Sequence, residues 1–413
     1  MKIAVCLKVI QPRDGTSHFA LQLGRVLAGA GHDVTMVAEI IGPPEPGLGG
    51  PGLPVLRIGQ TRWETAAGNV HRIGRLVRER GFRALFICSG LPVRHLEQAL
   101  CLMPDSVAIV PVLGGDREHV YQPVQRTAAA WNFVVAESPR LLREIRARVP
   151  EKPARLLTTG IVHPEEGELA GRAPLSVPLR LLYVGRLFGR KNVWMLPKIL
   201  AACLRRGLPS TLSVCGYGPD RGVLEQACRE EGVADRVEFL ELPSREDLYG
   251  ALRSHHVSLL TSSPGEGLGL VLLEAQANGC VPVASRLPGV TDFSVEDGVT
   301  GLLAEVGEPE SFAEQVGRLA DPEVWRRFSE AGVARTRRQF SLEEMARQYG
   351  GLLEELEGGC HPLPVPRSRL PRPRFGPGSF VPRTFYPFAE RLHRLARGAR
   401  RPAVGTGPTS GRP

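Results

Sequence analysis

The chain has 413 residues, of which 42% are hydrophobic and 23% are charged. This length is more than one ordinary core holds and predicts two domains, while the composition is that of a globular protein and excludes a disordered chain. No apolar run reaches transmembrane length. The apolar run at the N-terminus is short and contains Lys8, so we expect a first strand there and not a signal peptide.

The formal net charge of +9 is concentrated at the C-terminus. Residues 360–413 contain 11 Arg, no Lys and one acid, Glu390, which gives +10 and leaves −1 for residues 1–359. A neutral body argues against a nucleic-acid-binding core. The eight cysteines are scattered without a Cys-x-x-Cys pair, which favours reduced thiols and a cytoplasmic location over a disulfide framework or a zinc site.

The first half alternates predicted strands and helices, followed by a linker. We expect strands at 2–9, 34–38, 84–88, 107–112 and 132–136, helices at 16–29 and 141–149 with Ser138 as the cap of the latter, and a Gly- and Pro-rich loop at 42–52. A polar stretch at 163–178 separates this half from the next. We assign 1–165 to a first domain and 166–178 to the linker.

The alternation restarts in the second half. We expect strands at 181–185, 211–215, 237–240, 257–261 and 281–285, and helices at 193–206, 222–231, 245–253, 269–278, 310–319, 323–340 and 341–356. Two such series predict an α/β protein with two doubly wound parallel sheets that face each other across a cleft. The second domain is placed at 179–340, and a closing helix at 341–358 is expected to pack back toward the first domain.

The segment from Pro264 to Ala275 contains the strongest chemical signal. Glu266 lies in a glycine-rich loop after a buried strand, and Glu274 lies in the early turns of the next helix. The glycines allow a ligand to approach, and free N–H groups at a helix start attract anions. A capping pair of acids would be about three residues apart, and these are eight apart. The pattern favours a site for a sugar joined to phosphate.

Two further loops follow predicted strands of the second half. Arg186 and Lys191 flank a loop that opens a helix, and Lys191 is one of only five lysines beside 47 arginines. Such distributed positive charge suits a diphosphate, although an ordinary basic loop is the alternative. Gly216 and Gly218 form a turn before Pro219 that does not have the spacing of a dinucleotide fingerprint. We interpret it as a turn that shapes the cleft.

These motifs, in this order, resemble the retaining glycosyltransferases of the GT-B fold, in particular glycosyltransferase family 4, the group 1 transferases. The resemblance is carried by Gly-Arg-Leu…Lys at 185–191, Gly-x-Gly-Pro at 216–219, Glu-Gly-Leu-Gly…Glu-Ala at 266–275 and Gly-Cys-Val-Pro-Val at 279–283. It is strong over 179–357 and weaker but continuous over 1–162. The tail has no counterpart in the family pattern.

The resemblance implies a role for each matching residue. Arg186 and Lys191 would hold the donor diphosphate, Glu266 would lie beside the donor sugar, and Glu274 would bind the ribose. The backbone of Gly267, Leu268 and Gly269 would face phosphate and sugar, and Gly15 would approach the donor phosphate from the first domain. UDP is the favoured donor nucleotide, with GDP and ADP open. No Asp-x-Asp pair ends a strand of the second half, so we expect no essential metal ion and no further cofactor.

The acceptor side is less defined. Family members often have a histidine at the end of a mid-domain strand, where this chain has Leu113-Gly114-Gly115-Asp116 with His119 beyond. Asp116 and His119 are the candidates, against the alternative of a solvated loop. The function predicted is transfer of a sugar to a hydroxyl acceptor in polysaccharide, glycolipid or glycoconjugate biosynthesis. The alternatives are a nucleotide-sugar epimerase or hydrolase on the same scaffold, or a non-catalytic sugar-nucleotide binder.

The tail at 360–413 is rich in Pro and Arg, which argues against a packed core. Within it, residues 384–397 place Phe385, Phe388, Leu392 and Leu395 at helical spacing opposite three arginines. This pattern is typical of a basic amphipathic helix that contacts an anionic membrane, here at its inner face. A solubilising tail and a helix packed on the body are the alternatives.

Overall fold

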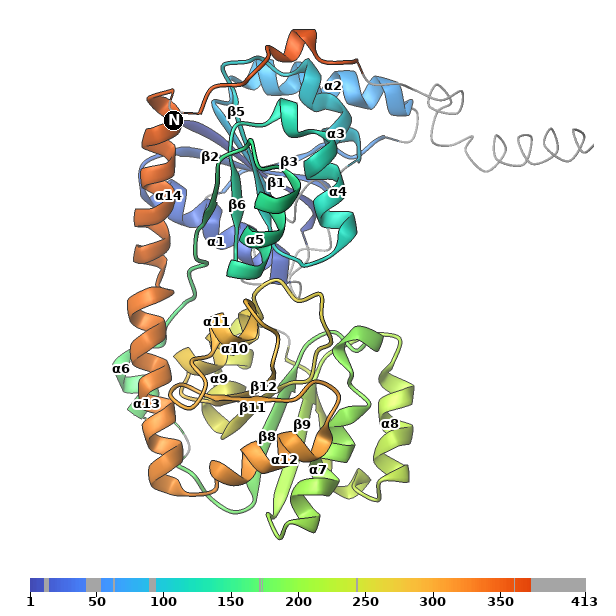
Figure 1. Cartoon of the computed structure of the whole chain (residues 1–413), viewed down its shortest axis with the longest axis vertical. Helices are drawn as coiled ribbons and strands as arrows, with labels where there is room; N and C mark the ends of the chain where they lie inside the picture. Colours follow the sequence, from blue (N-terminus) through green and yellow to red (C-terminus); the bar gives the residue numbers. More distant parts are fainter. Residues whose placement is uncertain are drawn as a thin grey trace, which may run out of the picture.

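The computed structural model describes residues 1–10, 15–41, 53–61, 64–88, 94–170, 172, 174–242, 244–359 and 361–372. The loop predicted at 42–52 and the amphipathic helix predicted at 384–397 lie outside these residues. The described chain forms two α/β domains, one above the other in Figure 1, and a pair of long helices runs along one side of both.

The first domain is built on a parallel sheet with seven strands in the described residues, in the order β3-β2-β1-β4-β5-β6-β7. The strands are β1 Lys2–Ile10, β2 Asp33–Ile41, β3 Val55–Arg57, β4 Ala84–Cys88, β5 Ala108–Leu113, β6 Val134–Ala136 and β7 Ala154–Leu156. The helices are α1 Gly15–Gly29, α2 Ala66–Arg80, α3 Arg94–Ala99, α4 Glu118–Arg126 and α5 Pro139–Arg148. The central strands are buried on both faces, as expected where helices cover a parallel sheet.

The second domain repeats this plan with the order β10-β9-β8-β11-β12-β13. Its strands are β8 Leu179–Val184, β9 Ser210–Cys215, β10 Val237–Leu240, β11 Val257–Leu260, β12 Val281–Ser285 and β13 Leu302–Ala304. Its helices are α7 Met195–Arg205, α8 Arg221–Glu230, α9 Arg245–Ser254, α10 Leu270–Ala277, α11 Thr291–Ser294 and α12 Pro309–Arg318. Strand order reverses between β8 and β11, and ligands of such sheets bind outside that point.

Two crossings connect the domains. The first contains the short helix α6 Glu166–Ala170. The second joins α13 Pro322–Gln339 to α14 Leu342–Glu357, which run almost end to end along the molecule in Figure 1. Ser341 caps α14 by accepting from the Glu344 N–H, and it pairs with Ile161 in an isolated bridge. Four α14 side chains, Met345, Tyr349, Leu352 and Leu353, are buried in the core of the first domain.

Helix α2 is absent from the elements predicted above, although its sequence signals are local. Val70, Ile73 and Val77 are buried at helical spacing, the Thr65 side chain accepts from the Gly68 N–H, and Gly81 ends the helix with φ of 68°. These are ordinary start and stop signals. The cap predicted at Ser138 is only half right, because Ser138 occupies the N-cap position of α5 but its side chain makes no capping hydrogen bond.

The prediction that the chain is unpacked from residue 360 onward is wrong for its first part. Residues 361–372 cross the first domain, and Arg367 there is 1% exposed. Its guanidinium donates to the backbone oxygens of Ala130 and Pro104 and to Asn132 Oδ1. Arginine has five donors, so it can be buried when carbonyl oxygens surround it. None of the helices in the described part of the chain has the length and apolar character needed to cross a bilayer.

Candidate active site

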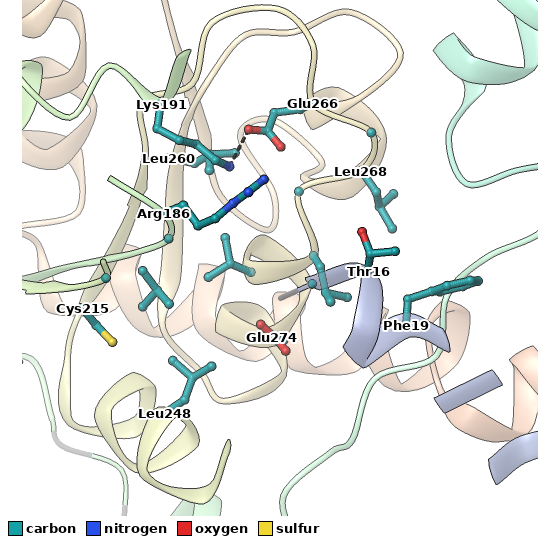
Figure 2. A pocket seen from close by; sticks show the side chains of 18 of the residues that line it. Thr16, Phe19, Arg186, Lys191, Cys215, Leu248, Leu260, Glu266, Leu268 and Glu274 are labelled. Carbon is teal, nitrogen blue, oxygen red and sulfur yellow. Dashed lines mark hydrogen bonds and ion pairs between the residues drawn. The ribbon is translucent and has the colours of Figure 1, made fainter. Parts of the chain in front are cut away.

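A cleft of about 650 Å³ lies between the two domains, a volume in the usual range for a small-molecule site. Its walls are the loops that follow β1, β5 and β6 in the first domain and β8, β9, β10 and β11 in the second. All ten residues proposed for the donor side line it: Gly15, Arg186, Lys191, Gly216, Gly218, Glu266, Gly267, Leu268, Gly269 and Glu274. Figure 2 shows the acids and cations converging from the second domain, with Thr16 and Phe19 of α1 opposite.

A cluster of cations surrounds Glu266 at one end of the cleft. Lys191 Nζ lies 2.5 Å and Arg190 Nη1 lies 2.9 Å from the same oxygen, Glu266 Oε1. Arg186 is on the same loop after β8 and lines the cleft beside them. Its guanidinium lies 5.0 Å from the centre of the Phe188 ring, and the Arg190 guanidinium lies 5.4 Å from the same centre. The loop thus presents three cations, and sequence reasoning had selected only two of them.

The Glu266 carboxyl stays ionised because of these neighbours. Burial pushes its pKa up, but the positive charges of Lys191 and Arg190 outweigh burial and lower the pKa to about 2. Two cations share one carboxylate, so the cluster keeps a positive excess. The positive charge also acts on Arg117 of the first domain, which lines the same cleft. Burial and the positive charges of Arg190 and Arg186 lower the pKa of Arg117. An anionic ligand would relieve this repulsion.

Glu274 occupies a different environment. It is the single charged residue of α10, whose other residues are apolar except for Gln276, and it is 3% exposed. Burial raises its pKa, while Arg245 at the start of α9 opposes that effect with Nη1 2.5 Å from Glu274 Oε1. His18 of α1 lies 3.8 Å from the same oxygen across the domain boundary. Burial, Arg245 and Arg25 lower the pKa of His18 well below its usual value, so the imidazole is neutral.

Glycines allow the loops of this site to approach one another. A Cβ on Gly267 would lie 2.3 Å from the backbone oxygen of Gly114, so the two domains touch here and only glycine fits. A Cβ on Gly216 would lie 2.0 Å from the oxygen of Gly185. Gly269 adopts a φ of 76° at the N-cap of α10, a conformation that favours glycine.

The backbone between Glu266 and α10 leaves donors available. In the part of the chain that the structure describes, the N–H groups of Gly267, Leu268 and Gly269 do not donate to backbone oxygens. The Leu268 side chain is buried in a small apolar cluster with Ile161, Leu273, Ala277 and Phe340. Leu268 therefore anchors the loop through its side chain and through its carbonyl oxygen, which accepts a hydrogen bond from the buried Ser294 hydroxyl.

The acceptor-side candidates from the sequence are not in the cleft. Asp116 accepts a hydrogen bond from the Tyr121 hydroxyl and pairs with Arg140, and His119 is exposed on α4. Neither lines the cavity, so both assignments are corrected: Asp116 serves local structure and His119 faces solvent. The first-domain wall is instead formed by Thr16, Phe19, Glu137 and Thr159, together with glycines and Arg117.

Arg190, Arg245, His18 and Glu137 are the residues that sequence reasoning missed. Arg190 precedes Lys191 and could have been found, but one arginine among 47 carries little signal. Arg245 and His18 contact Glu274 only through the tertiary fold, and no local sequence spacing predicts that contact. Among the described residues, no group of three or more His, Cys, Asp or Glu side chains is arranged to hold a metal ion.

Comparison with known proteins agrees with this geometry. The family model described as glycosyl transferases group 1 matches residues 178–321, the segment that carries the cation cluster and both acids. The second domain is a group 1 glycosyltransferase domain. The alpha-D-kanosaminyltransferase of Streptomyces kanamyceticus is 30% identical over 190 residues, which are 46% of this chain and 49% of that protein. The chain spans about half the length of the curated relatives it matches.

Solved structures extend the likeness to both domains. Sucrose-phosphate synthase from Thermosynechococcus elongatus superposes with a TM-score of 0.71 at 20% identity, over 87% of this chain and 100% of that one. Anabaena HepE in complex with UDP and glucose gives a TM-score of 0.69 at 18% identity, over 85% and 99%. The two domains of this chain therefore have the GT-B fold, as the sequence predicted.

Proposed function

We propose that this chain is a retaining glycosyltransferase that moves a sugar from a nucleoside-diphosphate sugar to a hydroxyl acceptor. The observation that carries the proposal is the shared cleft: Arg186, Arg190 and Lys191 meet Glu266 at one end, and Glu274 lies buried further along. A nucleoside-diphosphate sugar matches this arrangement, because its diphosphate can contact the cations, its sugar can contact Glu266 and its ribose can contact Glu274.

The cation cluster would bind the diphosphate and stabilise it as it leaves. Departure of a nucleoside diphosphate builds negative charge, and fixed cations stabilise such charge without reorganising during the reaction. Glu266 positions Lys191 and Arg190 through its Oε1 and leaves Oε2 for the hydroxyls of the donor sugar. The free N–H groups at the start of α10 add donors on the same side.

Glu274 would accept hydrogen bonds from the ribose hydroxyls. This role needs a carboxylate, and Arg245 favours the ionised form although burial disfavours it. Replacing Glu274 with alanine should weaken binding of the nucleoside diphosphate by about tenfold or more, as expected for hydrogen bonds to a charged group. An unchanged dissociation constant in calorimetry would remove the ribose role.

UDP is the favoured donor nucleotide, since Anabaena HepE was solved with UDP and glucose. GDP and ADP would compete in a thermal-shift screen of the full chain, and the nucleotide that stabilises most identifies the base. The tail, with its charge of +10, would contact the anionic inner face of a membrane, which suits an acceptor in polysaccharide or glycolipid synthesis.

Product analysis by NMR tests the proposal as a whole. A transferred sugar that keeps the anomeric configuration of the donor supports it. An epimerised or hydrolysed donor would favour the alternative chemistry on the same scaffold, and saturable nucleotide binding without turnover would favour a binding protein. The same product analysis is repeated with a Glu266→Gln variant. This variant should keep the fold and lose most turnover, because Arg190 and Lys191 lose their ion pairs with Glu266.

A further inference from the structure

Glu137 is a buried acid in the first-domain wall of the cleft. It directly follows β6, is 8% exposed, and lines the cavity with Thr16, Phe19 and Thr159. These residues line the same cavity as the cation cluster of the second domain. The position is therefore the one from which a second substrate would meet the donor.

Nothing in the described protein compensates the Glu137 carboxyl. No ion pair or hydrogen bond among the described residues involves its side chain, and burial alone raises its pKa to about 8. A buried acid without a partner is costly, because its desolvation is not offset. At neutral pH the group is mostly protonated, so it can both donate and accept a hydrogen bond.

The surroundings keep this carboxyl in place and leave room for a ligand. A Cβ on Gly114 would lie 3.3 Å from both carboxyl oxygens, so the glycine opens the space next to them. The titratable groups that face the Glu137 carboxyl are Cys88 at the end of β4 and Tyr349 of α14. Burial raises the pKa of both groups, and the negative charge of Glu137 raises it further. The buried Tyr349 hydroxyl also has no hydrogen-bond partner in the described residues.

We propose that Glu137 binds the acceptor, and that the acceptor is an uncharged, hydroxyl-rich molecule held by a two-way hydrogen bond to this carboxyl. The assignment rests on the proposed function and specifies its second substrate. A hydroxyl matches the carboxyl as both donor and acceptor. An ammonium would be repelled by Arg117, Arg186 and Lys191 in the same cleft, and an anion would be drawn to those cations and away from Glu137.

A purely structural role for Glu137 does not explain its properties. An acid retained for stability would be paired or exposed, and a neutral residue of similar size would avoid the desolvation cost. The carboxyl lines the cavity and has no partner among the described residues, so the interaction that compensates it comes from a ligand. The experiment must therefore separate acceptor binding from folding and from nucleotide binding.

The test uses the full chain with the glucose ester of whichever nucleotide, UDP, GDP or ADP, stabilises it in the thermal-shift screen. Nucleotide release is measured with myo-inositol, D-glucosamine or D-glucuronate as the acceptor probe. We expect myo-inositol to be preferred. Glu137→Ala should raise the apparent KM for myo-inositol about tenfold or more, since a site built to bind a hydroxyl loses that contact. Glu137→Gln should stay within about threefold at pH 7, because the amide also donates and accepts.

Three readouts distinguish the outcomes. The wild-type KM for myo-inositol should rise above about pH 8, where the carboxyl ionises, while Glu137→Gln should stay flat. Nucleotide affinity should be unchanged in both variants, and Glu151→Gln, an exposed acid of the first domain outside the cleft, serves as the control. Preference for glucosamine or glucuronate, an unchanged KM in Glu137→Ala, or a KM that falls through pH 8 would overturn the assignment. No turnover with any probe while nucleotide still binds would overturn it and leave the donor site standing; no nucleotide binding would overturn the proposed function.

Discussion

Replacing Glu137 with glutamine should stabilise the protein, and the gain should depend on pH. The folded pKa of about 8 lies above the ordinary value of 4.5 that the unfolded chain has. The folded state therefore binds a proton more tightly, and stability is lost as pH rises from the unfolded pKa toward the folded one. Glutamine mimics the protonated form and removes this dependence.

The magnitude follows from the two pKa values. Keeping the carboxyl protonated costs about 1.4 kcal/mol for each pH unit above 4.5, or about 3 kcal/mol at pH 7. At pH 5 the cost is below about 1 kcal/mol, and above about pH 8 it stops growing because the folded carboxyl then ionises as well. Burial of the side chain to 8% exposure means that solvent screening reduces these figures little.

Urea unfolding at pH 5, 7 and 8 measures the effect. Glu137→Gln should be more stable than the wild type by about 3 kcal/mol at pH 7 and by less than about 1 kcal/mol at pH 5. Glu151→Gln should follow the wild type throughout. A stability difference that does not change with pH would refute the reasoning. It would mean that the carboxyl is compensated in solution by a partner.

Three further predictions concern the second domain, the domain contact and the tail. Lys191→Ala should lower turnover by about 10² or more, because the leaving diphosphate loses a fixed charge. Lys198→Ala, which removes a lysine that lies over the Trp194 ring outside the cleft, is the control. Equal turnover in the two variants would contradict this role for Lys191. Gly267→Ala should reduce turnover and increase the radius of gyration in small-angle scattering, since its Cβ would lie 2.3 Å from a backbone oxygen of the first domain. Gly250→Ala is the control, because a Cβ there meets nothing within 4 Å. Equal behaviour of the two variants would count against the domain contact. Removal of 373–413, which spares the packed segment before it, should abolish sedimentation with vesicles of anionic phospholipid, whereas undiminished binding would exclude the tail as the contact.

The parts of the site that the sequence revealed are those with local signals. Lys191 and Glu266 follow adjacent strands at the point where strand order reverses, so a motif after a buried strand was enough to bring them together. Glu274 is the single charged residue of a mostly apolar helix, which is also visible in the sequence. Ten residues from separate segments could therefore be placed in one cleft before the fold was known.

The residues that the sequence did not reveal depend on contacts between distant segments. Arg245 reaches Glu274 from another helix, and the buried environment that shifts Glu137 comes from β4, β5 and α14 together. Arg367 illustrates the limit of composition rules: a Pro- and Arg-rich segment predicts an unpacked chain, yet one guanidinium satisfies three oxygens of the first domain and becomes buried.

The central claim is that the cleft binds a nucleoside-diphosphate sugar through Arg186, Lys191, Glu266 and Glu274. A crystal structure of the full chain with the nucleoside diphosphate that stabilises it most tests this claim directly. We expect the diphosphate oxygens to contact Arg186 and Lys191 and the ribose hydroxyls to contact Glu274. A nucleotide bound outside the cleft, or inside it but remote from these side chains, would contradict the account.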